Sequence, residues 1–212
     1  MHSNRELAEY LRSQGWLKTP SLVKAFEKTD RTKFIPPAYA EHAYLDTPLP
    51  TLEGQTISAP SVVALMTEAL QPKAGQKILE VGSGSGYQAA VIAEAIGLKG
   101  RLYTVESVPA LFDYAKQKLS AYENVEVVYA DGSLGLPDKV PFDGIIVTAG
   151  APSVPKALFD QLKEGGRLVI PVGQRYFQDL LLVRKVDGKP LTENLLSVAF
   201  VPLIGKQGFK PE

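Results

Sequence analysis

The sequence contains no cysteine and only two histidines among its 212 residues. The absence of cysteine excludes disulfides, thiolate nucleophiles and metal sites built on cysteine. His2 and His42 are too few for a histidine-rich metal site, so we expect no bound metal. Catalysis by a cysteine or by a metal held on cysteine is therefore excluded, and a histidine-rich metal site is not expected.

An excess of charge of either sign is also missing, since Lys plus Arg and Asp plus Glu number 23 each. Without an overall positive field, nonspecific binding to nucleic-acid phosphates is disfavoured. No apolar run approaches the length that spans a membrane, and residues 1–20 mix charges throughout, unlike a signal peptide. We therefore expect a cytoplasmic protein that binds neither nucleic acid nor membrane.

What remains is the composition of a folded globular chain. Hydrophobic residues make up 45% of it and charged residues 22%, which is ordinary for such proteins. A chain of this length suffices for one well-filled core. We expect a single domain over residues 1–212, with an N-terminal helical cap and substrate-side arm at 1–59 and an α/β core at 60–212.

The N-terminal part is expected to be helical and then irregular. Apolar periodicity predicts helices at 3–14 and 21–29. The stretch FIPPAYAEHAYLDTPLP, residues 34–50, is too rich in proline for regular helix and predicts an ordered arm. At Pro60 the pattern changes, because PSVVALMTEAL carries apolar residues at helical spacing with proline in its first turn.

Beyond this third helix, short β-branched runs alternate with helical segments. Strands are expected at 77–83, 101–107, 125–131, 144–150, 167–173, 179–186 and 195–205, and helices at 87–96, 109–121 and 154–163. Such alternation indicates a mostly parallel sheet covered on both faces. The turn signal DGKP between the last two strands predicts an antiparallel hairpin. The expected fold class is α/β, a doubly wound, mostly parallel seven-stranded sheet with an antiparallel C-terminal hairpin and an N-terminal helical cap.

Three glycines follow the first strand of this pattern. In ILEVGSGSGYQAA, Gly82, Gly84 and Gly86 separate a buried strand from a helix, where missing side chains let a ligand approach the backbone amides. The spacing is G-x-G-x-G, so the third glycine of the dinucleotide fingerprint G-x-G-x-x-G is absent. Taken alone, the loop also fits a plain tight turn.

Acidic residues at the ends of the next two strands favour a ligand. Glu106 ends the second strand, where a carboxylate can accept hydrogen bonds from the two hydroxyls of a ribose, and Asp131-Gly132 follow the third. Each has a simpler alternative, a solvated strand end or an Asp-Gly turn. Together with the glycine loop, they place three groups at the carboxyl edge of the sheet, where open α/β sheets bind ligands.

This arrangement resembles the class I S-adenosylmethionine-dependent methyltransferases, whose signature is an acidic residue, x, G-x-G-x-G, here Glu80 to Gly86. The resemblance implies a Rossmann-like sheet and S-adenosyl-L-methionine as cofactor, with S-adenosyl-L-homocysteine as product. The loop carries no Lys or Arg of the kind that a P-loop uses for phosphate, which fits a cationic sulfonium.

The segment after the fourth strand limits which chemical group can accept the methyl group. It reads TAGAP at 148–152, where enzymes that methylate amide or base nitrogens carry Asn/Asp-Pro-Pro-aromatic. The absence of cysteine also excludes the covalent thiolate route to carbon 5 of pyrimidines. What remains is an acceptor already ionised at neutral pH. A carboxylate satisfies this and needs no general base.

A hydroxyl can hold such a carboxylate in line with the sulfur–methyl bond without taking part in proton transfer. Ser58, within TLEGQTISAP at 51–60, is the predicted catalytic residue. Its alternative role is to cap the helix that starts near Pro60, because serine often satisfies the free amides there. The two roles can coexist.

Seven stretches together resemble the protein-L-isoaspartate(D-aspartate) O-methyltransferases. They are AYLDTPLP 43–50, GQTISAP 54–60, ILEVGSGSGYQAA 78–90, DG 131–132, PFDGIIVTAGAPSVP 141–155, LKEGGRLVIPVG 162–173 and AFVPLIG 199–205. GQTIS is far more selective than the glycine loop. The resemblance implies methylation of the free α-carboxylate of L-isoaspartyl residues in damaged proteins and peptides, which starts their repair through succinimide formation.

The same resemblance gives each site residue a role. Ser58 would be the active-site serine, Thr56 and Ile57 would line the junction of cofactor and substrate, Gly82, Ser83 and Gly84 would contact the methionine part, Glu106 the ribose, and Asp131 with Gly132 the adenine end. The family often has Thr in place of Ser83 and Ala in place of Gly150, and neither change removes a needed group. We expect a monomer.

Three other functions remain open on sequence grounds. A methyltransferase for another carboxylate or small molecule would bind the cofactor identically and differ only around 34–60 and 195–209. A non-catalytic binding module would retain the sheet and regulate a partner. A nicotinamide-dependent reductase is disfavoured by the missing third glycine.

Overall fold

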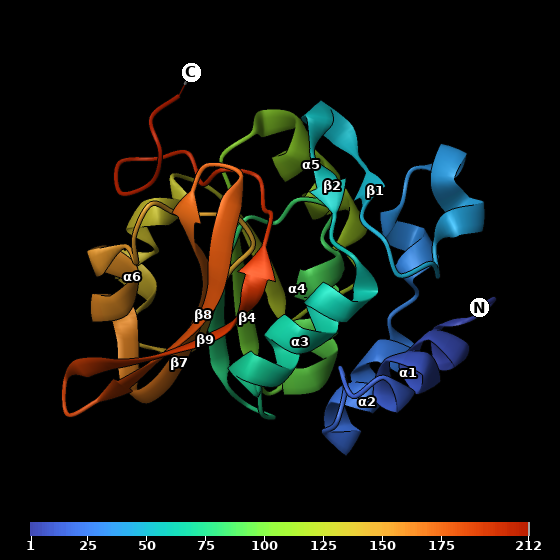
Figure 1. The fold of residues 1–212 in the computed structure, drawn as a ribbon, viewed down its shortest axis with the longest axis horizontal. Coiled ribbons are helices and arrows are strands. Elements are labelled where there is room, and N and C mark those ends of the chain that lie inside the picture. The colour runs from blue at the N-terminus through green and yellow to red at the C-terminus, as the bar shows by residue number, and fades with distance from the viewer. Residues whose placement is uncertain (212) are drawn as a thin grey trace.

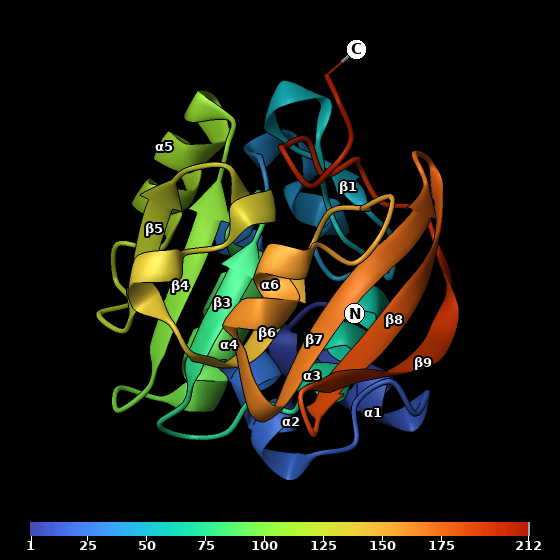
Figure 2. The same cartoon turned by 90° about the vertical axis from the view of Figure 1, so that its left-hand side faces the viewer.

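A seven-stranded mixed sheet runs through the centre of the computed structural model, which describes residues 1–211 (Figure 1). Its strands are β3 Lys77–Val81, β4 Arg101–Glu106, β5 Val125–Tyr129, β6 Phe142–Val147, β7 Leu162–Gln174, β8 Phe177–Val186 and β9 Lys189–Val198. Figure 2 shows them side by side in the order β5-β4-β3-β6-β7-β8-β9. The first five in this order are parallel, and β8 and β9 are antiparallel to their neighbours. The predicted fold class is confirmed.

Helices cover both faces of the sheet because successive strand residues point to opposite sides. On β3, Ile78 belongs to an apolar cluster shared with α3 Pro60–Leu70 and α4 Tyr87–Ile96. The adjacent Leu79 belongs to a second cluster on the other face, shared with Leu158 of α6 Lys156–Gln161. Helix α5 Pro109–Lys118 packs on β4 and β5 and adds Ala115 to the first cluster.

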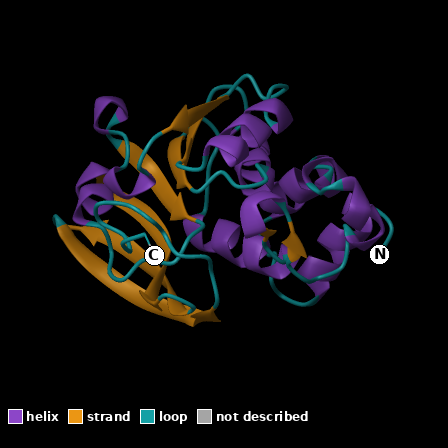
Figure 3. Cartoon of the chain, turned by 90° about the horizontal axis from the view of Figure 1, so that it is seen from above, coloured by secondary structure: helices purple, strands orange, loops and turns teal. Residues whose placement is uncertain are grey.

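The N-terminal cap consists of α1 Asn4–Ser13 and α2 Pro20–Lys28, which pack on α3 and α4. Seen from above, this group of helices lies to one side of the sheet (Figure 3). The Ser3 side chain caps α1 by accepting from the Glu6 amide. Glu68 on α3 accepts hydrogen bonds from the backbone amides of Lys18 and Thr19, each at 2.6 Å. These bonds tie the start of α2 to the core.

The arm that links cap and core contains no α-helix, as its proline content predicted. It comprises the 3-10 segments η1 Arg31–Phe34, η2 Pro37–His42 and η3 Leu52–Gly54 and the short strands β1 Leu49–Pro50 and β2 Thr56–Ile57. The two strands pair antiparallel, and η3 contacts α5. The arm therefore crosses the carboxyl edge of the sheet before α3 begins.

The last strand differs from the prediction of 195–205. It starts at Lys189, directly after a turn in which Asp187 and Gly188 have φ values of 51° and 72°. Because β9 is an exposed edge strand, its first half is polar and gave no apolar signal. The apolar run beyond it leaves the sheet, and Leu203 donates to the Gly150 carbonyl at 2.7 Å instead.

None of the helices within residues 1–211 combines the length and the apolar character needed to cross a membrane.

Candidate active site

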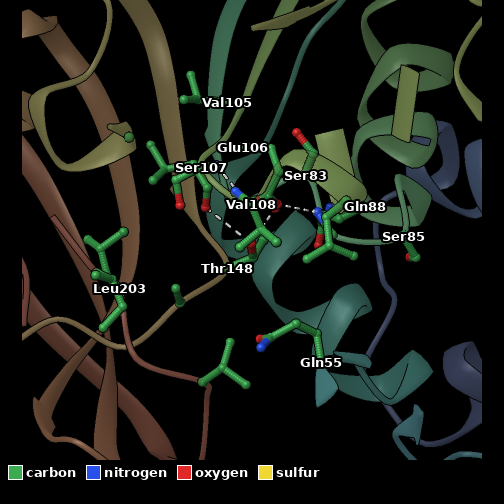
Figure 4. A pocket seen from close by; sticks show the side chains of 18 of the residues that line it. Gln55, Ser83, Ser85, Gln88, Val105, Glu106, Ser107, Val108, Thr148 and Leu203 are labelled. Carbon is green, nitrogen blue, oxygen red and sulfur yellow. Dashed lines mark hydrogen bonds between the residues drawn. The ribbon is translucent and has the colours of Figure 1, made fainter. Parts of the chain in front are cut away.

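A cavity of about 630 Å³ opens at the carboxyl edge of the parallel strands (Figure 4). Its volume lies in the range of small-molecule sites. All nine residues predicted for the site line this cavity, namely Thr56, Ile57, Ser58, Gly82, Ser83, Gly84, Glu106, Asp131 and Gly132. The wall facing the strand ends comes from the arm and from residues 201–205. The fold thus brings the predicted residues together, while their individual roles stay predictions.

The glycine loop needs glycine for two different reasons. Gly82, Gly84 and Gly86 have positive φ values of 98°, 50° and 86°, a region that other residues adopt only with strain. A Cβ at Gly82 would also collide with the hydroxyl of Thr148, which donates to the carbonyls of Val81 and Gly82. A side chain at position 82 would therefore distort this loop.

Glu106 is held in place by three backbone amides. Its Oε1 accepts from Ser107 at 2.8 Å and from Val108 at 3.0 Å, and its Oε2 accepts from Gly84 at 3.0 Å. Figure 4 shows this carboxylate at the cavity wall beside Ser83 and Ser107. A buried acceptor, fixed before any ligand arrives, suits the hydroxyl pair of a ribose.

Asp131 fastens one end of the cavity to the C-terminal segment. Its Oδ1 accepts from the Ser133 amide at 3.0 Å and hydroxyl at 2.6 Å, and its Oδ2 accepts from the Lys206 amide at 2.8 Å. Burial alone would raise the pKa of Asp131, but these hydrogen bonds outweigh it and hold the pKa below its usual range. About four lone-pair sites exist on a carboxylate, so one on Oδ2 is left for an amine donor of a ligand.

The hydroxyl of Ser58 does not cap α3. The N-cap position belongs to Ala59, which makes no side-chain hydrogen bond, and the free amide of Ser61 donates to Asp46 Oδ1 at 2.8 Å. Among residues 1–211, the Ser58 side chain has no hydrogen-bond partner, yet Ser58 lines the cavity. The capping alternative is therefore wrong, because a carboxylate from the arm takes that role.

Cationic side chains are absent from the lining of the cavity among the described residues. Only Glu106 and Asp131 carry charge there, and the remaining polar groups are hydroxyls, amides and backbone. Nor does any group of three or more His, Cys, Asp or Glu side chains gather at one point within residues 1–211. The described lining therefore offers a ligand no fixed positive charge.

Sequence reasoning missed several lining residues. Gln55 and Gln88 project amide groups, Thr148 lies under the glycine loop, and Leu203 adds an apolar wall (Figure 4). The family-like stretches 54–60, 78–90, 141–155 and 199–205 contained all of them, but no spacing within those stretches distinguishes a lining side chain from a structural one.

Comparison with known proteins decides the family. The family model described as Protein-L-isoaspartate(D-aspartate) O-methyltransferase (PCMT) matches residues 2–208. The chain belongs to this family. Protein-L-isoaspartate O-methyltransferase of Methanopyrus kandleri is 48% identical, covering 98% of this chain and 94% of the relative. The Pyrococcus horikoshii protein of the same name is 46% identical, covering 97% and 94%.

Two solved structures of isoaspartate O-methyltransferases are similar over almost the whole chain. One described as a protein-L-isoaspartate O-methyltransferase gives a TM-score of 0.88 at 33% identity and covers 97% of this chain and 67% of the other. The other, described as a putative enzyme of this kind from Plasmodium falciparum in complex with S-adenosyl-L-homocysteine, gives 0.86 at 28%, covering 96% and 99%. Family and fold therefore agree.

Beneath the site of this isoaspartate O-methyltransferase family member lies a fully buried acid, Glu80. Thr104 donates to its Oε2 at 2.5 Å, the Ser83 and Thr104 hydroxyls share a hydrogen bond of 2.7 Å, and Glu80 Oε1 has no partner. Burial raises the pKa of Glu80 to about 8; the Thr104 hydrogen bond opposes the rise, and the charge of Glu106 adds to it. The carboxyl group is thus mostly protonated at neutral pH.

Glu80→Gln is expected to remove a pH dependence of stability. The folded protein holds the Glu80 proton to a higher pH than the unfolded chain, so the wild-type free energy of unfolding falls as pH rises from about 4.5 toward about 8. Glutamine cannot ionise, so the variant should gain on wild type by at most about 1.4 kcal/mol per pH unit in this window. Urea unfolding at pH 5, 6.5 and 8 measures the difference. Glu126→Gln is the control. The pKa of Glu126 is lowered, chiefly by a hydrogen bond from Arg101, so the difference in unfolding free energy between this variant and wild type should stay constant over the same pH range.

Glu106→Ala is expected to weaken binding of S-adenosyl-L-homocysteine by roughly 1 to 3 kcal/mol, the cost of unpaired polar groups. Because three backbone amides also lose their acceptor, we expect a small loss of stability beside it. Titration calorimetry measures the affinity. Glu126→Ala, on the neighbouring strand and outside the cavity, should leave it unchanged. An unaltered affinity in Glu106→Ala would mean that the ribose is held elsewhere.

Proposed function

We propose that this protein transfers a methyl group from S-adenosyl-L-methionine to the free α-carboxylate of L-isoaspartyl residues in damaged proteins and peptides. The observation that carries this proposal is that, among residues 1–211, Ser58 has a hydroxyl without a hydrogen-bond partner at a cavity lined by the glycine loop and Glu106 but by no cationic side chain. Membership of the isoaspartate O-methyltransferase family over residues 2–208 supports the same substrate.

The cavity fits the cofactor by its shape and its acceptors. Position 82 has no room for a side chain, so the backbone of the loop is open to the cofactor, and Glu106 presents a fixed carboxylate. We assign Gly82, Ser83 and Gly84 to the methionine part, Glu106 to the ribose, Asp131 and Gly132 to the adenine end, and Thr56 with Ile57 to the junction with the substrate. When bound, the cofactor supplies a methyl group on a cationic sulfur.

In this reaction the protein itself orients the acceptor carboxylate and keeps cationic side chains away from it. An acceptor carboxylate that attacks this methyl group loses its negative charge in the transition state. A fixed Lys or Arg would favour the charged ground state and raise the barrier, and the described part of the lining contains neither. Ser58 can donate a hydrogen bond that holds one carboxylate oxygen in line with the methyl carbon. No proton has to be removed, so no general base is needed.

The product of this step is prepared for repair. Methoxide leaves a carbonyl carbon more readily than the oxygen of a free carboxylate does. The neighbouring backbone nitrogen can therefore attack the ester carbonyl carbon, form the C–N bond of a succinimide and expel methoxide, which leaves as methanol with the amide proton. Hydrolysis of the succinimide returns part of the chain to the normal aspartyl linkage.

Methyl transfer to two peptides that differ only in one aspartyl or isoaspartyl linkage tests the proposal. We expect the isoaspartyl peptide to be methylated and its aspartyl twin to stay at background, because only the former presents a free α-carboxylate at that residue. Radiolabelled cofactor gives the measurement. Equal methylation of both peptides would remove the repair function and leave a methyltransferase of broader substrate range.

We further propose that the cap at 1–59 and the core at 60–212 act as one domain. The apolar cluster that contains Phe26 and Phe34 from the N-terminal part and Tyr87 from the core supports this. A monomer that works in the cytoplasm and binds neither nucleic acid nor membrane stays a prediction, which light scattering and cell fractionation would test.

A further inference from the structure

A buried guanidinium lies directly behind the Ser58 backbone. Arg31, the first residue of η1, is 0% exposed and is the largest fully buried side chain of the described residues. Its Nη2 donates to the Ser58 carbonyl at 2.8 Å, and its Nε donates to the Ala43 carbonyl at 2.9 Å. One planar side chain at the start of the arm therefore holds two later points of the arm.

The charge of Arg31 is not neutralised by an ion pair. Within residues 1–211, no carboxylate lies at salt-bridge distance from it. Burial lowers the pKa of Arg31, and Tyr87 and Asp46 only partly oppose this. A buried cation without a carboxylate partner is costly, and an apolar residue of similar volume is often at least as stabilising. Stability alone is therefore a poor explanation for an arginine at this position.

The rear of the guanidinium rests on the helix that follows the glycine loop. Arg31 Cζ lies 4.7 Å from the ring centroid of Tyr87, the first residue of α4. Phe26 and Phe34 pack against the same ring at centroid distances of 6.4 Å and 5.8 Å. Burial raises the pKa of Tyr87 to about 12, so the ring supplies a neutral face to the cation. The guanidinium is thus fixed from behind while it holds two carbonyls in front.

Ser58 depends on this arrangement because no hydrogen bond from the described residues orients its hydroxyl. Its side chain has no hydrogen-bond partner among residues 1–211, so the direction of the hydroxyl follows the backbone at residue 58. Ile57 is paired in β2, Ala59 occupies the N-cap position of α3, and within residues 1–211 Arg31 is the one donor to the Ser58 carbonyl between them. Loss of that donor would free the peptide unit between Ser58 and Ala59, and with it the backbone that carries the Ser58 side chain at the cavity.

We propose that Arg31 is a positioning residue for methyl transfer, which sets the backbone of Ser58 relative to the glycine-loop helix. The proposal rests on the proposed function of Ser58 as the residue that orients the acceptor carboxylate. Arg31 does not line the cavity and acts only through the peptide unit that it holds.

The test compares Arg31→Met and Arg31→Lys with Glu68→Ala. Glu68 joins the same cap to the core through Lys18 and Thr19 but does not touch Ser58. Well below the melting temperature of the least stable variant, Arg31→Met should lower kcat on the isoaspartyl peptide by about tenfold or more. Affinity for S-adenosyl-L-homocysteine should stay within about threefold of wild type. Arg31→Lys should recover kcat only in part, because an ammonium lacks the planar fork that serves two carbonyls.

Glu68→Ala should lower the melting temperature and keep kcat near wild type. Arg31→Met with normal kcat, full recovery in Arg31→Lys, or an equal loss of kcat in Glu68→Ala would overturn the proposal. The first and third results would show that Arg31 contributes only to stability, and full recovery in Arg31→Lys would show that hydrogen bonds from one planar group to two carbonyls are not what positions Ser58.

Combining Arg31→Met with Ser58→Ala tests whether the effect passes through Ser58. If it does, the double variant should turn over at the rate of Ser58→Ala alone, because interacting residues are not additive. A further tenfold loss would overturn the proposed route. Hydrogen exchange of the amides in 57–59 gives a readout without turnover. It should accelerate in Arg31→Met and stay unchanged in Glu68→Ala, whichever peptide the wild-type enzyme methylates.

Discussion

Replacing Ser58 with alanine is expected to slow methyl transfer by about tenfold or more, with the melting temperature and cofactor affinity almost unchanged. Ser58 lines the cavity and its hydroxyl has no hydrogen-bond partner in residues 1–211, so removal of the hydroxyl breaks no hydrogen bond of the folded protein. What is lost is the donor that aligns the acceptor carboxylate. Steady-state kinetics with an isoaspartyl peptide, calorimetry with S-adenosyl-L-homocysteine and thermal unfolding measure the three quantities.

Two neighbouring substitutions serve as controls. Ser61→Ala removes a hydroxyl outside the cavity and should change neither rate nor stability. Asp46→Ala removes the carboxylate that caps α3 and should lower the free energy of unfolding by about 1 kcal/mol. A normal rate in Ser58→Ala would exclude Ser58 from orienting the acceptor and would move attention to Gln55 or to backbone amides of the arm.

Much of the fold could be predicted because it follows from short-range patterns. The apolar runs of β3 and β6 and the helical spacing of α4 report burial directly, and strand–helix alternation gives a parallel sheet. The position of the site followed as well, since Gly82, Glu106 and Asp131 each end or follow a strand whose carboxyl end lies at one edge.

Partners far apart in the chain could not be predicted. Ser58 and Asp46 are both plausible caps for α3 by composition, and only the course of the arm brings Asp46 to the Ser61 amide. Asp131 meets the Lys206 amide across 75 residues, and no spacing announces that contact. The polar first half of β9 gave no signal either, because an edge strand needs no apolar face.

Contacts of Arg31 and of Asp131, which the sequence did not predict, hold the two sides of the cavity. Arg31 holds the arm on one side of the cavity, while Asp131 and Ser133 hold residues 206 and 207 on the other. Gly205 lies so close to the Asp131 carboxylate that it has no room for a Cβ. Polar side chains therefore hold both walls of the cavity, Arg31 on the side of the arm and Asp131 with Ser133 on the side of the C-terminal segment.

Gly82→Ala is expected to have the most severe effect on the cofactor site. Alanine at a φ of 98° is strained by about 1 to 3 kcal/mol, and its Cβ would push on the Thr148 hydroxyl. That hydroxyl donates to the Val81 and Gly82 carbonyls at 3.1 Å and 2.6 Å, so moving it loosens the end of β3 as well. We expect affinity for S-adenosyl-L-homocysteine to fall by about tenfold or more, in line with a cost of about 1.4 kcal/mol or above.

Gly188→Ala separates strain from the collision. Gly188 has a φ of 72° in the turn between β8 and β9, a Cβ placed there would meet no atom within 4 Å beyond its chain neighbours, and the residue lies outside the cavity. Its alanine variant should lose stability through strain alone and bind the cofactor product normally. Gly82→Ala should lose more stability than Gly188→Ala. Each additional kcal/mol should lower its melting temperature by roughly 2 to 4 °C at this chain length. If calorimetry finds the same affinity in Gly82→Ala as in wild type, the cofactor does not lie against this loop, because a displaced Thr148 and a strained residue 82 would reshape the surface that should hold its methionine part.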